Sequence, residues 1–130
     1  MTRSIAIVED ETNIAMALTF MLRREGFQTG HIDDGKLAMD SLRAAPPDLV
    51  LLDVMLPHVS GFEICQQIRL DPAFENTRVV LMTAAGGGME RRKGLALGAD
   101  DFVQKPFDIG ELIEKVKRLT GGVGEVEADA

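Results

Sequence analysis

The chain has 130 residues, 45% of them hydrophobic and 27% charged, which is ordinary for one globular domain. Its formal net charge of −7 argues against non-specific nucleic-acid binding, and it has no apolar run near the roughly 20 residues of a membrane span. A single cysteine, Cys65, and the lack of a signal-peptide pattern at the N-terminus predict a cytoplasmic protein in a reducing compartment.

Strands and helices are predicted to alternate along the whole chain. The expected strands span residues 4–9, 27–32, 47–53, 78–83 and 101–104. The expected helices span residues 11–25, 35–45, 61–70, 88–97 and 107–119, and apolar residues at helical spacing mark the first and the last of them. This alternation predicts a doubly wound α/β domain over residues 1–119, with a five-stranded parallel sheet and helices on both faces. Residues 120–130 are expected to form a flexible acidic tail or the start of a linker.

Asp53 is the most informative residue of the sequence. It ends an apolar run that is too continuous for a half-exposed strand, so the strand should be buried on both faces and present Asp53 at its C-terminal end. Ligands of open parallel sheets bind at that edge. Glu9 and Asp10 follow the first strand, Thr83 ends the fourth and Lys105 follows the fifth. We therefore expect three carboxylates, a hydroxyl and an ammonium group to converge.

The chemistry of these groups favours a hard cation and a tetrahedral anion. Three neighbouring carboxylates repel one another, which raises the pKa of at least one unless a positive charge intervenes. Mg²⁺ prefers carboxylates, waters and phosphate oxygens, whereas a zinc site would need His or Cys at zinc-like spacing. A cation, Lys105 and Thr83 placed around one carboxylate would suit the transfer of a phosphoryl group to it.

The motifs together resemble the receiver domain of two-component response regulators, over about residues 4–119. That resemblance implies the flavodoxin-like (βα)₅ fold. Each motif is short, but all of them occur in order and at the ends of predicted strands. They are Glu9–Asp10, Leu51–Asp53, Pro57 with Gly61, Met82–Ala84, Gly98–Phe102 and Lys105–Phe107.

This resemblance implies a role for each acidic residue. Asp53 would accept a phosphoryl group from the phosphohistidine of a sensor histidine kinase. Asp10, Asp53 and the backbone carbonyl of Met55 would bind Mg²⁺ directly, and Glu9 would act mainly through water. The domain would then act in phosphorelay signal transduction, on an output domain or protein that the sequence does not identify.

The resemblance also implies moving parts. Lys105 would pair with the Asp53 carboxylate and then with the phosphoryl oxygens, across a cis peptide bond to Pro106. Thr83 would be drawn inward to a phosphoryl oxygen, and Phe102 would turn from an exposed to a buried rotamer behind it. The domain would be a regulatory phosphoacceptor, not a conventional enzyme, that assists its own phosphorylation and slow dephosphorylation. Dephosphorylation should be slow because Met55 and Ala85 stand where many receivers place polar groups near the hydrolytic water.

Charges of both signs are expected on the fourth helix, the fifth strand and the last helix. This mixture is similar to the face through which receivers of winged-helix transcription factors pair, so a homodimer through these elements is one interpretation. An ordinary solvated surface is the other, and the segment itself contains no DNA-binding domain. The residues concerned are Arg91, Arg92, Lys93, Asp100, Asp101, Glu111, Lys115 and Arg118.

Other proteins with this fold fit the motifs less well. A flavodoxin would need a Ser/Thr-rich phosphate loop after the first strand, where Glu9–Asp10–Glu11 would repel the FMN phosphate. A haloacid-dehalogenase phosphatase usually has Asp-x-Asp, but Met55 replaces the second acid here. A receiver that acts as an interaction module without phosphorylation would not need all five site groups.

Several residues also have simpler interpretations. Asp10 could cap the first helix, and Phe102 could be an ordinary core aromatic. Cys65 is expected to be a buried apolar residue, and His31 and His58 are expected at the surface. The glycines before and within the fourth helix, among them Gly94, predict either a weak helix held by packing or a bistable element.

Overall fold

The structure is a computed structural model that describes residues 2–84 and 88–121. Ala85, the Gly86–Gly87 pair and most of the predicted tail, residues 122–130, lie outside the described residues. Of the predicted tail, Thr120 is the last residue of a helix, and Gly121 follows it as a left-handed C-cap with φ 81°.

The predicted alternation of strands and helices is confirmed, and the predicted boundaries differ from the observed ones by at most two residues. The strands are β1 (Ser4–Val8), β2 (Gln28–Ile32), β3 (Leu49–Asp53), β4 (Arg78–Thr83) and β5 (Asp101–Gln104). The helices are α1 (Thr12–Arg24), α2 (Gly35–Ala44), α3 (Gly61–Leu70), α4 (Gly88–Ala96) and α5 (Ile109–Thr120), with a short 3₁₀ turn at Pro72–Phe74.

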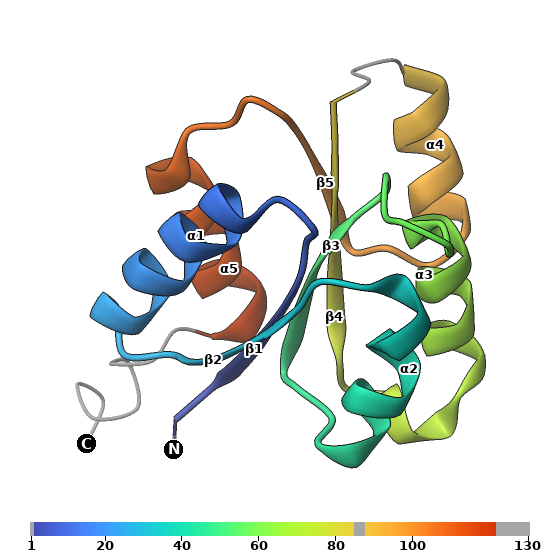
Figure 1. The fold of residues 1–130 in the computed structure, drawn as a ribbon, viewed down its shortest axis with the longest axis horizontal. Helices are drawn as coiled ribbons and strands as arrows, with labels where there is room; N and C mark the ends of the chain where they lie inside the picture. Colours follow the sequence, from blue (N-terminus) through green and yellow to red (C-terminus); the bar gives the residue numbers. More distant parts are fainter. Residues whose placement is uncertain (1, 85–87, 122–130) are drawn as a thin grey trace.

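The five strands form one parallel sheet in the order β2-β1-β3-β4-β5. Helices α1 and α5 cover one face and α2, α3 and α4 cover the other, so each face has its own apolar cluster (Figure 1). All five residues of β3 are buried, as expected for a central strand covered on both sides. The predicted doubly wound (βα)₅ fold is therefore confirmed.

The strand order places a crevice site between β1 and β3. In the sheet, β2 lies on one side of β1 and β3 lies on the other. The connection that leaves β1 and the connection that leaves β3 therefore run in opposite directions from neighbouring strand ends. Ligands of doubly wound sheets bind at such a point. Val8 and Leu52 are register partners there, which brings the residues that follow them, Glu9 and Asp53, side by side.

Local sequence signals fix where several helices begin. Asp34, Ser60 and Asp108 each accept a hydrogen bond from a backbone N–H in the first turn of the helix that follows. Asp108 delays α5 to Ile109, two residues after the predicted start. Cys65 lies fully buried on α3, as expected. Within residues 2–84 and 88–121, none of the helices combines the length and the apolar character needed to cross a membrane.

Candidate functional site

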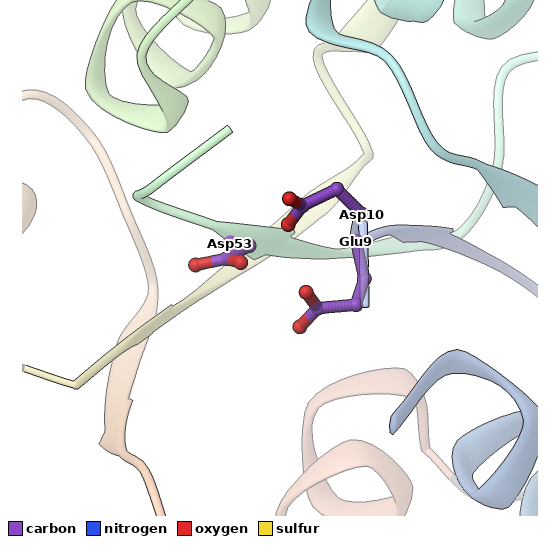
Figure 2. Close-up of side chains that lie close together, drawn as sticks. All are labelled: Glu9, Asp10 and Asp53. Atoms are coloured by element: carbon purple, nitrogen blue, oxygen red, sulfur yellow. The ribbon is translucent and has the colours of Figure 1, made fainter. Parts of the chain in front are cut away.

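The three predicted carboxylates meet at the C-terminal edge of the sheet. Glu9 and Asp10 follow β1, Asp53 ends β3, and their side chains point into a common space (Figure 2). One oxygen of each carboxylate lies within 4.8 Å of the others. In the part of the chain that the structure describes, this is the one group of three or more potential metal ligands.

Asp53 is held by both of its oxygens. Oδ1 accepts a hydrogen bond of 3.0 Å from the backbone N–H of Met55, and Oδ2 accepts one of 3.1 Å from Lys105 Nζ. The residue is only 3% exposed. Behind it, the first residue of α3, Gly61, lies so close that an added Cβ would overlap the carbonyl oxygen of Asp53. A glycine is therefore needed there for α3 to pack against the site.

Glu9 and Lys105 form the buried ion pair of the site. Lys105 Nζ lies 2.7 Å from Glu9 Oε1, and the backbone N–H of Glu11 donates to Glu9 Oε2 at 3.1 Å. Burial, together with a smaller effect of neighbouring Asp53, raises the pKa of Glu9 to about 7 against the opposing effect of Lys105. Burial alone would lower the pKa of Lys105, but its bonds to Glu9 and Asp53 outweigh burial and raise it.

The net negative charge of the site favours the binding of a cation. Lys105 contributes one positive charge, whereas Glu9, Asp10 and Asp53 contribute up to three negative ones. The cluster offers only carboxylate oxygens, the donors that Mg²⁺ prefers. Both Glu9 oxygens already accept hydrogen bonds, while Asp10 is exposed. The residues therefore fit Mg²⁺, and the exposed Asp10 is the most accessible of the three ligands.

The switch residues are arranged only in part as expected. Thr83 is buried, and its hydroxyl donates a hydrogen bond of 3.0 Å to Glu90 Oε2 on α4. Phe102 is 6% exposed, so its side chain lies in the buried arrangement and the predicted exposed rotamer is not the one observed. The movements of Thr83 and Phe102 remain predictions. The peptide bond between Lys105 and Pro106 is cis, as the resemblance implied.

Helix α4 has a packing reason for its internal glycine. A Cβ on Gly94 would come within 2.6 Å of Leu81 Cδ1 and 3.6 Å of the Phe102 ring, so the glycine lets α4 approach β4 and β5. This observation supports the simpler interpretation, a helix held by packing, although it leaves the bistable interpretation untested. The capping interpretation of Asp10 receives no support, because Glu11 occupies the N-cap of α1 and its side chain makes no capping bond.

Two contacts at the site were not expected from the sequence. Glu90 holds the Thr83 hydroxyl, and His31 Nε2 lies 2.7 Å from the backbone carbonyl oxygen of Glu9. His31 is exposed as predicted, but it also contacts the acidic pair. Away from these two contacts, His58, with φ 71°, pairs at 3.2 Å with Asp34, the N-cap of α2. No sequence motif predicts these contacts, because each depends on how separate elements pack.

Comparison with known proteins identifies the family. The model of the response regulator receiver domain matches residues 5–117. The chain belongs to the response regulator receiver family. Receivers of this family generally use Mg²⁺ and interact with histidine kinases, and its members are regulatory proteins.

The relatives and structural neighbours agree with this assignment. The chain is 44% identical over 119 residues to the phosphate regulon transcriptional regulatory protein PhoB of Rhizobium meliloti, covering 92% of this chain and 52% of that protein. It is 41% identical over 117 residues to the DNA-binding response regulator MtrA of Mycolicibacterium smegmatis, covering 90% of this chain and 50% of that protein. The BeF3-activated DrrB receiver domain superposes with a TM-score of 0.82 at 34% identity, over 93% of this chain and 99% of that one.

These relatives are winged-helix response regulators, as the sequence suggested. The chain spans about half the length of the curated relatives it matches. It corresponds to their receiver part, and the family assignment does not favour the interpretation as a module that works without phosphorylation.

Proposed function

We propose that Asp53 accepts a phosphoryl group from the phosphohistidine of a sensor histidine kinase, and that this switches the surface formed by α4, β5 and α5. One observation carries the proposal. The nearly buried Asp53 carboxylate lies 3.1 Å from the Lys105 ammonium and shares a cluster of carboxylate oxygens with Glu9 and Asp10. A cytoplasmic location goes with this proposal, because the kinase and its phosphodonor act there.

The Mg²⁺ ion of the family would be held by Asp10, Asp53 and the backbone carbonyl of Met55. Glu9 would contribute mainly through water, as the resemblance to the family implies; its carboxylate oxygens are bonded to Lys105 and to the Glu11 N–H. When bound, the ion supplies positive charge for the oxygens of the transferred phosphoryl group. The backbone bond from Met55 to Asp53 Oδ1 keeps the loop that carries this carbonyl close to the phosphoacceptor.

The transfer itself needs positioning more than new covalent chemistry. One Asp53 oxygen forms a bond to phosphorus as the P–N bond of phosphohistidine breaks, and the electron pair of that bond goes to the imidazole nitrogen. Lys105 stabilises the negative charge, first on the carboxylate and then on the phosphoryl oxygens. Thr83 would donate its hydroxyl to a phosphoryl oxygen, giving up the bond to Glu90.

A hollow beside the site offers a place for the kinase to dock. It has a volume of about 260 Å³ and lies between α1 and the segment that joins β5 to α5. Its lining includes Ile14, Ala17 and Phe107 together with the site residue Lys105. An apolar helix face could therefore bind here with its phosphohistidine close to Asp53.

The output is proposed to use the charged face formed by α4, β5 and α5, through a homodimer or through an output domain or protein. On this face Asp101 lies 3.0 Å from Lys115 and 3.6 Å from Arg118 of the same chain. A two-fold dimer would exchange some of these pairs for pairs between subunits. The domain would assist its own phosphorylation, and slow dephosphorylation would follow from the apolar Met55 side chain near the site.

The first test is the intact mass of the protein after incubation with a small-molecule phosphodonor and Mg²⁺. We expect the wild type to gain one phosphoryl group, and Asp53→Asn or chelation of Mg²⁺ to abolish the gain. Asp40→Asn is the matched control, because Asp40 is an exposed aspartate on α2 away from the site. If neither a phosphodonor nor a histidine kinase modifies the wild type, the proposal is wrong.

A further inference from the structure

The end of the edge strand β2 holds the backbone of Glu9 at two points. The N–H of Glu9 donates to the carbonyl oxygen of Ile32 at 3.0 Å, and the carbonyl oxygen of Glu9 lies 2.7 Å from His31 Nε2. A carbonyl oxygen can only accept, so the imidazole must donate from Nε2, which a neutral ring of the Nε2–H tautomer and a protonated ring both do. Consecutive residues of β2 therefore fix both peptide groups of Glu9.

Fixing the Glu9 carbonyl also fixes how the chain enters Asp10. The carbonyl carbon of Glu9 and the nitrogen of Asp10 belong to one planar peptide unit, so the orientation of the first determines that of the second. Residues 9–11 form the short link between β1 and α1, and the Asp10 carboxylate must face Asp53 from this link. The Glu9 side chain is separately held by Lys105.

We propose that His31 is a positioning residue for the phosphoacceptor site. Its Nε2–H holds the Glu9–Asp10 peptide so that the Asp10 carboxylate faces Asp53. The inference rests on the proposed function, because it assigns His31 to the Mg²⁺-dependent chemistry of that site. His31 is exposed and adds little to the apolar core. Its bond to Glu9 is a side-chain contact added to the backbone pairing of β1 and β2.

Three variants separate positioning from the general stability of the edge strand. His31→Phe keeps a planar ring but has no donor. His31→Gln places an amide N–H at a similar reach. Thr29→Val is the matched control, since it removes another side-chain hydrogen bond of β2, the one from Arg23 Nε to Thr29 Oγ1, without contact to Glu9. The full chain is used in each case, and Mg²⁺ alone is the titrated probe.

Mg²⁺ affinity, measured by calorimetry or by NMR titration, is the deciding measurement. We expect His31→Phe to bind Mg²⁺ about three- to tenfold more weakly, the effect of losing one hydrogen bond. Its phosphorylation by a small-molecule phosphodonor should be slow at low Mg²⁺ and return to the wild-type rate at saturation. His31→Gln should remain within about twofold of the wild type, and Thr29→Val should not differ from it.

The outcomes also distinguish this inference from the proposed function. Equal Mg²⁺ affinity in His31→Phe and the wild type would overturn the positioning role, and so would equal losses in His31→Phe and His31→Gln. An Nε2 without its proton at a pH where the ring is neutral, visible in ¹⁵N NMR of the imidazole, would overturn it as well. A wild type that binds Mg²⁺ and shows these differences, yet accepts no phosphoryl group, would refute only the proposed function.

Discussion

The strand-end site and helix α4 are built in opposite ways. The strand-end site, made of Glu9, Asp10, Asp53 and Lys105, joins residues of three elements through buried ionic and backbone hydrogen bonds. Among the described residues of α4, by contrast, Gly94 alone is buried, whereas α3 buries five residues. Preorganised charges suit the chemical step, and weakly held elements suit a response. The comparison supports the proposal that a preorganised site carries the chemistry and that α4 responds to it.

Two glycines show the same difference between the strand-end site and α4 in how tightly they pack. At Gly61, an added Cβ would meet the backbone of Asp53 and Val54, which cannot move without distorting β3 and the proposed phosphoacceptor. At Gly94, it would meet the end of the Leu81 side chain, which has more freedom to adjust. The site therefore tolerates less change than the helix that is proposed to respond to it.

The largest effect is expected for Gly61→Ala. Overlap with backbone in a packed region costs about 3 kcal/mol, so the free energy of unfolding should fall by that amount. The folded fraction of Gly61→Ala should accept a phosphoryl group more slowly than the wild type, because Asp53 is displaced. Urea unfolding and intact mass measure the two effects.

Gly94→Ala is the matched control for this prediction. The gain in helix propensity, about 1 kcal/mol, opposes the cost of moving Leu81, so the free energy of unfolding should change by less than about 1 kcal/mol. Equal losses in both variants would contradict the contrast between a rigid site and an adaptable helix.

A smaller effect is expected from the titration of Glu9 in metal-free protein. Its pKa is raised from 4.5 to about 7 on folding, so the folded state binds the proton more tightly than the unfolded state does. This contribution is fully present below pH 4.5 and is lost as the pH rises through about 7. The raised pKa of Lys105 adds no change in this range, since it lies above 10.5.

The free energy of unfolding in EDTA should therefore fall by about 2 kcal/mol between pH 5 and pH 8. Glu9→Gln should remove most of this slope, whereas Glu63→Gln, an exposed acid on α3, should retain it. Urea unfolding at several pH values provides the measurement. A slope of the opposite sign in the wild type would show that Lys105 stabilises the charged carboxylate more than burial penalises it.

The sequence was sufficient for the fold and for the members of the strand-end site, but not for its surroundings. Asp53 and Lys105 could be found because parallel strands bring their C-terminal ends to one edge, whatever the details of packing. The partners Glu90 and His31 could not be found, because helix placement and edge pairing decide their contacts. The rotamer of Phe102 could not be predicted from the sequence either, since the packing of α4 at Gly94 against β4 and β5 decides it.

The smallest effect, and the one that tests α4 most directly, is expected for Glu90→Ala. Thr83 donates its hydroxyl to Glu90 at 3.0 Å, and in the proposed switch it would exchange this acceptor for a phosphoryl oxygen on Asp53. Removing one hydrogen bond to a carboxylate shifts the free energy of such an exchange by about 1 kcal/mol or somewhat more. This corresponds to a change of roughly five- to tenfold in its equilibrium constant.

The rate of phosphate gain from a small-molecule phosphodonor, followed by intact mass, should therefore rise about fivefold at most in Glu90→Ala, because only part of the exchange is complete in the transition state. Glu114→Ala, which removes an exposed acid from α5, should leave the rate unchanged. In a Thr83→Ala background, the Glu90 substitution should have no further effect, since its partner is absent. Equal acceleration of phosphorylation by Glu90→Ala in the wild-type and Thr83→Ala backgrounds would show that Glu90 acts through its charge and not by holding the hydroxyl. The coupling of α4 to Asp53 would then be electrostatic alone.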